Sequence, residues 1–213
     1  MFCKCPAEAS IDTIPQIKCP ENFGQIQKIA FQRLMNDSGE KNCFIKESSD
    51  ITKLVSWTPL LAAVDSTKVV VSPYIYAPTE EEGAERTFGG GNESLGGITE
   101  NIGREPNSFT GSFKRIPQNV INTIKKLQCE SIAHNLGVYL FNEHGQIEAL
   151  KDSAIEDKFY PIPIESLFIG DKVHGGLEAP DSNSIKWLFL PNYSDTLTII
   201  TPEFNPLELA PAE

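Results

Sequence analysis

The sequence predicts a mainly β fold: a β-sandwich or barrel with one principal flanking α-helix, a long loop and an extended N-terminal arm. Most apolar runs are short, rich in β-branched and aromatic residues, and bounded by turn residues, as in strands. The 213 residues include 15 Gly and 15 Pro, which indicates many turns. A chain of this length can bury a sufficient core without disulfides or a structural metal.

We expect one domain with an extension at each end of the chain. Residues 1–20 carry three prolines and scattered charge, which predicts an extended arm that gains order from a partner. Residues 21–201 form the β-rich domain. Residues 202–213 contain three more prolines and are expected to be an irregular tail.

The first regular element is expected at residues 24–34. Two periods fit this segment, because Ile26, Ala30 and Leu34 would form a helical stripe, whereas Ile29 and Phe31 alternate with polar residues, less cleanly, as in a strand. We favour the strand.

A short helical region and a strand follow. Ser49 or Asp50 can cap a helix over residues 51–55, and Pro59 is expected to open a second short turn over residues 60–64. Residues 68–75 are β-branched and apolar and end among prolines, which predicts a strand that leaves its sheet there.

The segment 78–105 differs in character from the rest of the chain. It holds seven acidic residues against two arginines, a local charge of −5. Five glycines loosen its middle, so residues 79–97 are predicted to form a long, flexible, acidic, Gly-rich loop.

A β-hairpin is predicted immediately after this loop. Residues 98–104 and 108–116 flank the turn-forming residues 105–107, and their pattern suits two paired strands. In the second strand Phe109 and Phe113 share one face and polar residues occupy the other.

The principal helix is predicted over residues 117–127. Pro117 suits a first helical turn, and four apolar residues then recur at helical spacing up to Leu127. Lys125 and Lys126 lie near the expected end, where positive charge favours the helix dipole.

The last third of the domain is predicted to be strands. Residues 136–141 and 146–150 read as a second hairpin around the turn 142–145. Three further strands are expected, at residues 162–169, 184–190 and 197–201.

The cysteines indicate a reduced protein. Their number is odd and includes no C-x-x-C pair, so they cannot form a complete disulfide framework within one chain; they are Cys3, Cys5, Cys19, Cys43 and Cys129. A zinc site at the first three with a further ligand is conceivable, but the spacing matches no common zinc finger. Without a signal peptide or an apolar run of about 20 residues, we expect cytoplasmic synthesis and no membrane association.

Catalytic candidates are few. The three histidines, His134, His144 and His174, each adjoin turn residues and read as surface histidines. A cysteine-dependent hydrolase would use Cys129 as nucleophile and His134 as base, but no oxyanion-hole signature accompanies them. We therefore expect no catalytic residues, no metal site and no cofactor.

Other motifs have simpler structural interpretations. Gly89–Gly91 lack the residues of a phosphate-binding loop, and the three glutamates at residues 80–82 lack the spacing of a calcium loop. Trp57 and Trp187 lie in apolar runs and are expected in the core.

The net charge argues against a protein that binds nucleic acid. The chain has 18 Lys and Arg against 29 Asp and Glu, a net charge of −11. A protein that gains affinity by neutralising phosphates is therefore disfavoured. The arm and the long loop instead suggest a subunit that docks with copies of itself.

Five segments carry a resemblance to a known class of proteins: GQIQKIAFQRL, RTFGGGNESLGG, NSFTGSFKRIPQNVI, PIPIESLFIGD and LEAPDSNSIKWLFLPN. Together they resemble structural proteins of tailed-bacteriophage virions, and the order of elements is most similar to a tail tube (major tail) subunit. The resemblance implies a β-sandwich or barrel that assembles as stacked hexameric rings around a DNA conduit. Residues 98–116 would supply the lumen hairpin, Pro117–Leu127 the helix, and residues 79–97 and 1–20 the connectors between rings.

The expected partners are therefore copies of this chain and other virion proteins, and the expected location is the phage tail. DNA would pass without specific binding, because an acidic wall does not hold phosphates. A head decoration protein or head–tail connector is the first alternative. An adhesin-like binding module and the cysteine hydrolase are more distant ones.

Overall fold

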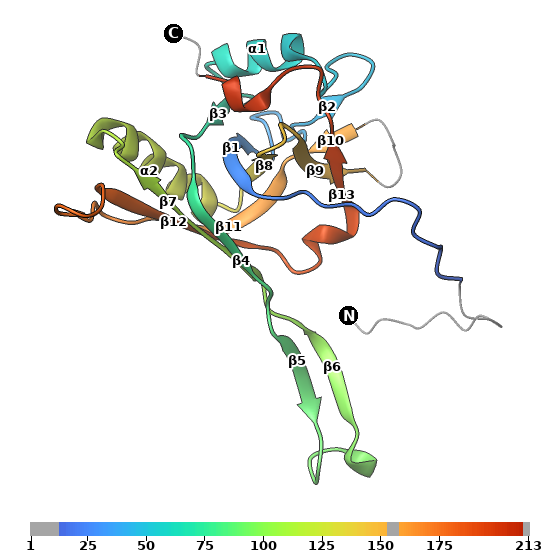
Figure 1. Cartoon of the computed structure of the whole chain (residues 1–213). Helices are drawn as coiled ribbons and strands as arrows, with labels where there is room; N and C mark the ends of the chain where they lie inside the picture. The colour runs from blue at the N-terminus through green and yellow to red at the C-terminus, as the bar shows by residue number, and fades with distance from the viewer. Residues whose placement is uncertain (1–12, 153–157, 211–213) are drawn as a thin grey trace.

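The structure of the protein is a computed structural model that describes residues 13–152 and 158–210. Figure 1 shows a globular body from which one hairpin projects. The strands of the body are β1 Ile26–Arg33, β2 Phe44–Ile45, β3 Val69–Val71, β4 Tyr76–Glu81, β7 Asn107–Lys114, β8 Leu136–Asn142, β9 Ile147–Lys151, β10 Lys158–Tyr160, β11 Ile162–Ile169, β12 Ser182–Phe189 and β13 Leu197–Ile200. The helices are α1 Leu54–Ala62 and α2 Gln118–Ile132, and the projecting strands are β5 Glu85–Gly89 and β6 Thr99–Arg104.

Strand β8 organises the body because both of its faces are buried. Every residue of this strand is buried, with β1 antiparallel along its whole length. Val138 and Leu140 belong to one hydrophobic core, and Tyr139 and Phe141 belong to a second. The alternation of side chains along one strand thus divides the interior into two cores.

The first core lies between the β1–β8 layer and the layer formed by β4, β7 and β12. Strands β7 and β12 pair antiparallel, and Phe109 of β7 stacks on Trp187 of β12 with ring centroids 3.8 Å apart. Helix α2 adds Ile121 and Ile124 to this core. These layers confirm a mainly β fold with a flanking helix. They also confirm the core position of Trp187 and the shared face of Phe109 and Phe113.

Strand β11 joins the two layers. Its beginning pairs with β8 through Ile162, and its remainder pairs with β12 from Ile164 onward. The register shifts between Glu165 and Phe168, where Ser166 adopts φ 54°. The strand changes partner between Pro163 and Ile164, before this irregularity is reached.

The second core is covered by α1, which lies at the top of Figure 1. Trp57 is fully buried there, and its ring lies 4.6 Å from that of Phe44 and 5.4 Å from that of Tyr139. The Trp57 Nε1–H donates to the carbonyl oxygen of Ile51 at 2.9 Å. Aromatic packing of this kind fixes α1 on the sheet.

Both predicted helices exist, with different bounds. Helix α1 begins at Leu54, after an Asx turn in which Asp50 accepts from the backbone of Thr52, and Pro59 lies inside it. Pro59 was expected to open a separate turn, and that expectation was wrong. Its missing N–H falls in the second turn of a short helix, where few backbone bonds are lost.

Helix α2 is longer than predicted. Pro117 is its N-cap residue, as the start signal indicated, but the helix continues past Leu127 to Ile132. Lys125 therefore lies in the middle of α2, where it pairs with Asp171 and not with the helix end. Ser131, in the last turn, is buried, and its hydroxyl accepts from the Leu167 N–H at 3.0 Å, which fixes this turn against β11.

Most predicted strands are confirmed. Residues 24–34 contain β1, and the predicted second hairpin is β8–β9. Residues 162–169 coincide with β11, and the strands expected at 184–190 and 197–201 correspond to β12 and β13. The strand expected over residues 68–75 is limited to Val69–Val71.

The segment 79–97 is not a flexible loop, and the predicted pairing of its neighbours was wrong. Residues 79–81 belong to β4, Glu85–Gly89 form β5, and β6 pairs with β5 and not with β7. Strand β7 pairs with β4 and β12. The strands at 98–104 and 108–116 exist, but the chain continues in one direction at Pro106 where a reversal was predicted.

The two end segments differ in how they contact the body. Residues 1–12 lie outside the described residues, and residues 13–20 are exposed and form no helix or strand. Residues 202–210 contain a single 3₁₀ turn, Pro206–Glu208. This turn is held to β1 because the Lys28 ammonium donates to the carbonyl oxygens of Leu207 and Leu209. Neither helix in the described ranges is both long and apolar enough to cross a membrane.

Candidate interaction surface

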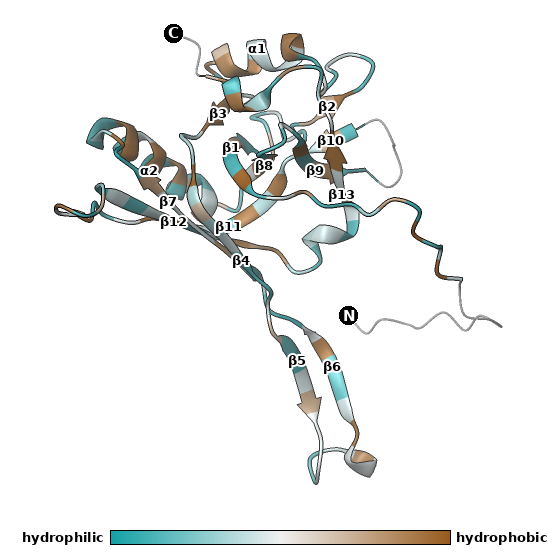
Figure 2. Ribbon diagram, in the orientation of Figure 1, coloured by the Kyte–Doolittle hydropathy of each residue, from teal (hydrophilic) through white to brown (hydrophobic). Residues whose placement is uncertain are grey.

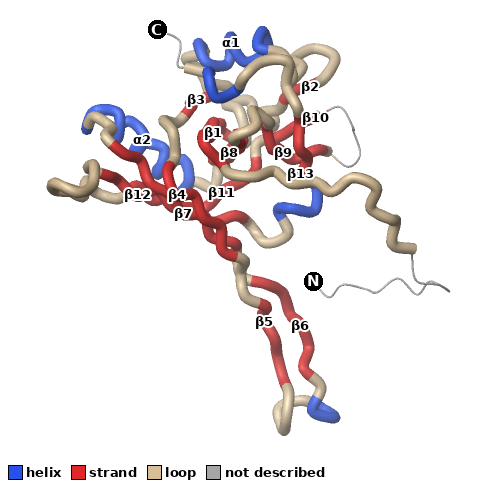
Figure 3. The backbone as a smooth tube through the Cα atoms, in the orientation of Figure 1, coloured by secondary structure: helices blue, strands red, loops and turns tan. Residues whose placement is uncertain are grey.

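One hairpin extends well away from the body, as Figures 1 and 3 show. We call residues 83–106, with β5 and β6, the projecting hairpin. Its strands continue the β4–β7 pair, so residues 76–114 make one long antiparallel ribbon whose inner part belongs to the body. The N–H of Glu105 donates to the carbonyl oxygen of Ala84 at 2.8 Å and links the two halves of the ribbon.

The two strands of the ribbon approach each other closely where it leaves the body. This close approach requires a glycine at position 83. A Cβ at Gly83 would lie 1.9 Å from the carbonyl oxygen of Glu105. The N–H of Gly83 donates to Oδ1 of Asn107 at 3.0 Å. Close backbone approach therefore fixes where the hairpin starts.

The tip of the hairpin is a turn rich in glycine. Gly89, Gly90 and Gly91 all have positive φ, which glycine adopts without strain. The Ser94 hydroxyl accepts from the Gly90 N–H at 3.0 Å and donates to the carbonyl oxygen of Ile98 at 2.6 Å. The glycines that suggested flexibility in the sequence thus build a closed turn.

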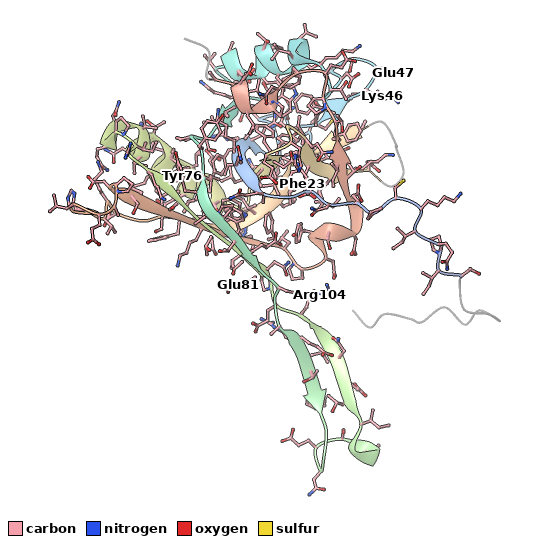
Figure 4. The ribbon with its side chains drawn as sticks, viewed as in Figure 1. Phe23, Lys46, Glu47, Tyr76, Glu81 and Arg104 are labelled. Carbon is pink, nitrogen blue, oxygen red and sulfur yellow. The ribbon has the colours of Figure 1, made fainter. Side chains whose placement is uncertain are left out.

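One face of the projecting hairpin is polar. Register places Thr87 opposite Asn101, and Glu85 opposite Arg104. The Asn101 side-chain amide donates to Oε1 of Glu85 at 2.8 Å on this face. Figure 4 shows Arg104 and Glu81 where the hairpin meets the body.

The other face, which includes the charged Glu100, also carries exposed apolar side chains. Phe88 lies opposite Glu100 and is 57% exposed, and Ile98, two residues before Glu100, is 67% exposed. Ile102, at the register shift, and Leu95, in the tip, are exposed as well. Figure 2 shows these apolar segments along the hairpin. A two-stranded ribbon without a covering layer is marginally stable in water, so this face is suited to a partner.

A polar network ties the root of the hairpin to the body. Oε1 of Glu80 accepts from the Tyr193 hydroxyl at 2.5 Å and from the Asn107 amide at 3.0 Å. Tyr193 lies in the 3₁₀ turn Tyr193–Thr196 (η2), and its ring stacks on Phe189 at 4.4 Å. Burial, and then the hydrogen bond to Glu80, raise the pKa of Tyr193 well above its usual range.

Strand β9 contributes a buried carboxyl group close to this network. Glu148 is 9% exposed. Burial first, and then the charges of Glu80 and Glu21, raise its pKa from 4.5 to about 7. No sequence pattern distinguishes these two residues. Glu148 occupies an ordinary polar position in an alternating strand, and Tyr193 lies in an ordinary turn.

The structure does not bring together the nucleophile and the base that a cysteine-dependent hydrolase would use. Cys129 is exposed on α2, and no hydrogen bond connects it with His134 in the described part of the chain. The Nδ1 atom of His134 lies 3.1 Å from Glu165 Oε1. His144 and His174 are exposed beside acidic partners, Glu143 and Asp181, as expected for surface turns.

The remaining candidates are scattered. Cys3 and Cys5 lie outside the described residues, whereas Cys19 is an exposed free thiol. Within residues 13–152 and 158–210, no group of three or more His, Cys, Asp or Glu side chains is placed to hold a metal ion. Glu80 lies in β4 and binds Tyr193, so the acidic run at residues 80–82 belongs partly to the sheet.

Comparison with known proteins gives little guidance. No family model matches the chain, and no curated protein matches it. Among solved structures, a chain of the anti-feeding prophage (AFP) baseplate, solved by cryo-EM and 6-fold symmetrised, is similar over 88% of this chain and 100% of its own length. The identity is 8% and the TM-score 0.34, which is below the value expected for a shared fold, so this likeness assigns no function.

Proposed function

We propose that this chain is a non-catalytic structural subunit of a phage tail or phage-tail-like particle, and specifically a tail tube subunit. The observation that carries the proposal is the projecting hairpin, whose apolar face has no cover within the described chain. A stable monomer gains nothing from such a face, whereas a subunit that docks with copies of itself buries it.

The two faces of the hairpin suit a tube wall. The polar face, with Glu85, Thr87 and Asn101, would line the lumen, and the face with Phe88 and Ile98 would pack on a neighbouring copy. The open edges of β5 and β6 could pair with the hairpins of adjacent subunits in a ring. Stacked hexameric rings around a DNA conduit are the form that the sequence resemblance implies.

The negative charge of the chain supports a conduit that does not bind the DNA passing through it. The net charge of −11 opposes binding of phosphates, and three of the carboxylates that contribute to it, Glu80, Glu81 and Glu82, lie at the root of the hairpin. A polymer of like charge would meet repulsion from such a wall and slide along it.

The test is assembly of purified protein, with and without the apolar face. We expect the natural chain to form six-fold rings or tubes in negative-stain images, and a Phe88→Ser/Ile98→Ser variant to remain monomeric by light scattering. A Thr87→Ser/Thr99→Ser variant, altered on the polar face alone, is the matched control and should assemble normally.

Three results separate the alternatives. A natural chain that stays monomeric at high concentration contradicts the proposal, as does normal assembly of the Phe88→Ser/Ile98→Ser variant. Monomers or trimers that coat empty shells would instead identify a head decoration protein. Unchanged circular dichroism of the variants establishes that a loss of assembly is not a loss of folding.

A further inference from the structure

Helix α1 has a second apolar face, which no described part of the chain covers. Trp57 and Leu61 are buried on the side of the helix that packs on the second core. On the outer side, Leu54 is 49% exposed and Val55 is 73% exposed. The other outer positions recur at helical spacing and are also exposed and uncharged: Thr58, Pro59 and Ala62. We call Leu54, Val55, Thr58, Pro59 and Ala62 the outer face of α1.

No charged residue interrupts this face. Residues 54–64 contain no Asp, Glu, Lys or Arg, although 22% of the chain is charged. Val64, just beyond the helix, is 98% exposed and extends the apolar surface. Contiguous exposed apolar surface on a protein marks a site of interaction with a partner.

The outer face of α1 and the projecting hairpin lie at opposite ends of the molecule. Figure 1 shows α1 at the top of the body and the hairpin extending from the bottom, with the sheets between them. Figure 2 shows apolar segments at both ends. The hairpin therefore cannot reach the α1 of its own chain. A contact between these two different surfaces would join separate copies head to tail.

The charges of the two surfaces are complementary. Residues 87–103 of the hairpin contain Glu93 and Glu100 and no Lys or Arg. Lys53 directly precedes α1 and is the one charged residue between positions 53 and 64. Two hairpins packed on each other would bring carboxylates together, and two α1 helices would bring lysines together. A hairpin packed on α1 instead pairs acidic with basic residues, so charge favours the contact between unlike surfaces.

We propose that the outer face of α1 is the docking surface for the projecting hairpin of a second copy of this chain. The hairpin face with Phe88 and Ile98 covers Leu54, Val55 and Pro59, and the hairpin carboxylates approach Lys53. Each subunit thus contributes one hairpin and receives another. The inference rests on the proposed self-assembly, and it adds the surface that receives the hairpin.

A single exposed substitution tests the receiving surface. Val55→Glu places a carboxylate on the outer face of α1, where it opposes both the apolar contact and the acidic hairpin. By sedimentation velocity, we expect this variant to require an at least about tenfold higher concentration than the natural chain for assembly. Val173→Glu is the matched control, because Val173 is 64% exposed and lies outside both surfaces. It should assemble as the natural chain does.

A mixing experiment tests whether the two surfaces are partners. The Phe88→Ser/Ile98→Ser variant keeps an intact α1, and Val55→Glu keeps an intact hairpin. At a concentration that assembles the natural chain, each variant alone should be monomeric. An equimolar mixture should form dimers with one copy of each variant. These dimers cannot grow, because each of their free surfaces carries a substitution.

The outcomes separate this inference from the proposed function. A natural chain that stays monomeric overturns both. Loss of assembly by Phe88→Ser/Ile98→Ser but not by Val55→Glu overturns the role of α1 alone. Equal effects of Val55→Glu and Val173→Glu, or a mixture that remains monomeric, also overturn it. Unchanged circular dichroism of each variant shows that the exposed substitutions leave the fold intact.

Discussion

Gly83 and Glu105 face each other so closely that a Cβ on Gly83 would lie 1.9 Å from the Glu105 carbonyl oxygen. The two residues belong to opposite strands of the ribbon, at the point where it leaves the body. The direction of the projecting hairpin is therefore set by backbone atoms, and one methyl group is enough to change it.

Replacement of Gly83 by alanine should misdirect the hairpin without unfolding the body. The clash lies outside both cores, so we expect the melting temperature to change by less than about 4 °C. Assembly, measured by light scattering, should be lost. Gly91→Asn is the control, since Gly91 has positive φ and open space around it and asparagine tolerates that conformation. Normal rings from Gly83→Ala would contradict this account of the root.

Glu148 should make folding stability depend on pH. Its pKa is about 7 in the folded chain and near 4.5 when unfolded, so the folded state binds the proton more tightly. Stability from this group is complete below pH 4.5 and falls by up to about 1.4 kcal/mol per pH unit until pH 7, roughly 3 kcal/mol at most. Urea unfolding of Glu148→Gln should lack this component. Parallel pH curves for the two proteins would refute the assignment.

The two buried tryptophans should respond differently to replacement by phenylalanine. Trp57 Nε1 donates to the Ile51 carbonyl oxygen, whereas Trp187 Nε1 is buried without a partner among the described residues. Trp57→Phe therefore loses a hydrogen bond and leaves a buried acceptor unpaired, and should cost about 1 kcal/mol more than Trp187→Phe. Denaturant unfolding of both variants measures the difference, and the reverse order would be inconsistent with these contacts.

An ion pair between β1 and α2 should contribute more to folding stability than a fully exposed ion pair does. Arg33 binds Glu130 through two nitrogens, Nε at 3.0 Å and Nη2 at 2.6 Å. Glu130→Gln should lower stability by about 1 kcal/mol, less at high salt. Asp171 is 95% exposed, so Asp171→Asn, which breaks its pair with Lys125, should leave the unfolding midpoint unchanged. Equal effects of both substitutions would contradict this distinction.

Local patterns predicted much of the body. The bounds of β11 follow from an apolar run between turns, and the start of α2 follows from Pro117. Both signals are contained within a few residues. The extension of α2 past Leu127 was missed because the last turn depends on Ser131, whose partner Leu167 is distant in sequence.

The projecting hairpin was missed for a different reason. Glycine and glutamate disfavour strands, so residues 79–97 resembled a loop, and Pro106 resembled a turn. Only the register of β5 with β6 shows that Phe88 and Ile98 share a face. Likewise, Glu148 is buried in β9, which contacts η2, and no local pattern predicts a contact between segments so far apart in the sequence.

The two strands of the projecting hairpin leave the body side by side, at Gly83 and Pro106, so the hairpin is structurally independent of the body. Its length could change without any alteration of the chain path through the two cores. Each added pair of residues, one per strand, would extend the reach by about 3.3 Å and invert the faces of everything beyond it. Extensions that keep apolar and polar sides aligned would therefore come in steps of two pairs, so the reach of the hairpin could be engineered only in increments of about 7 Å.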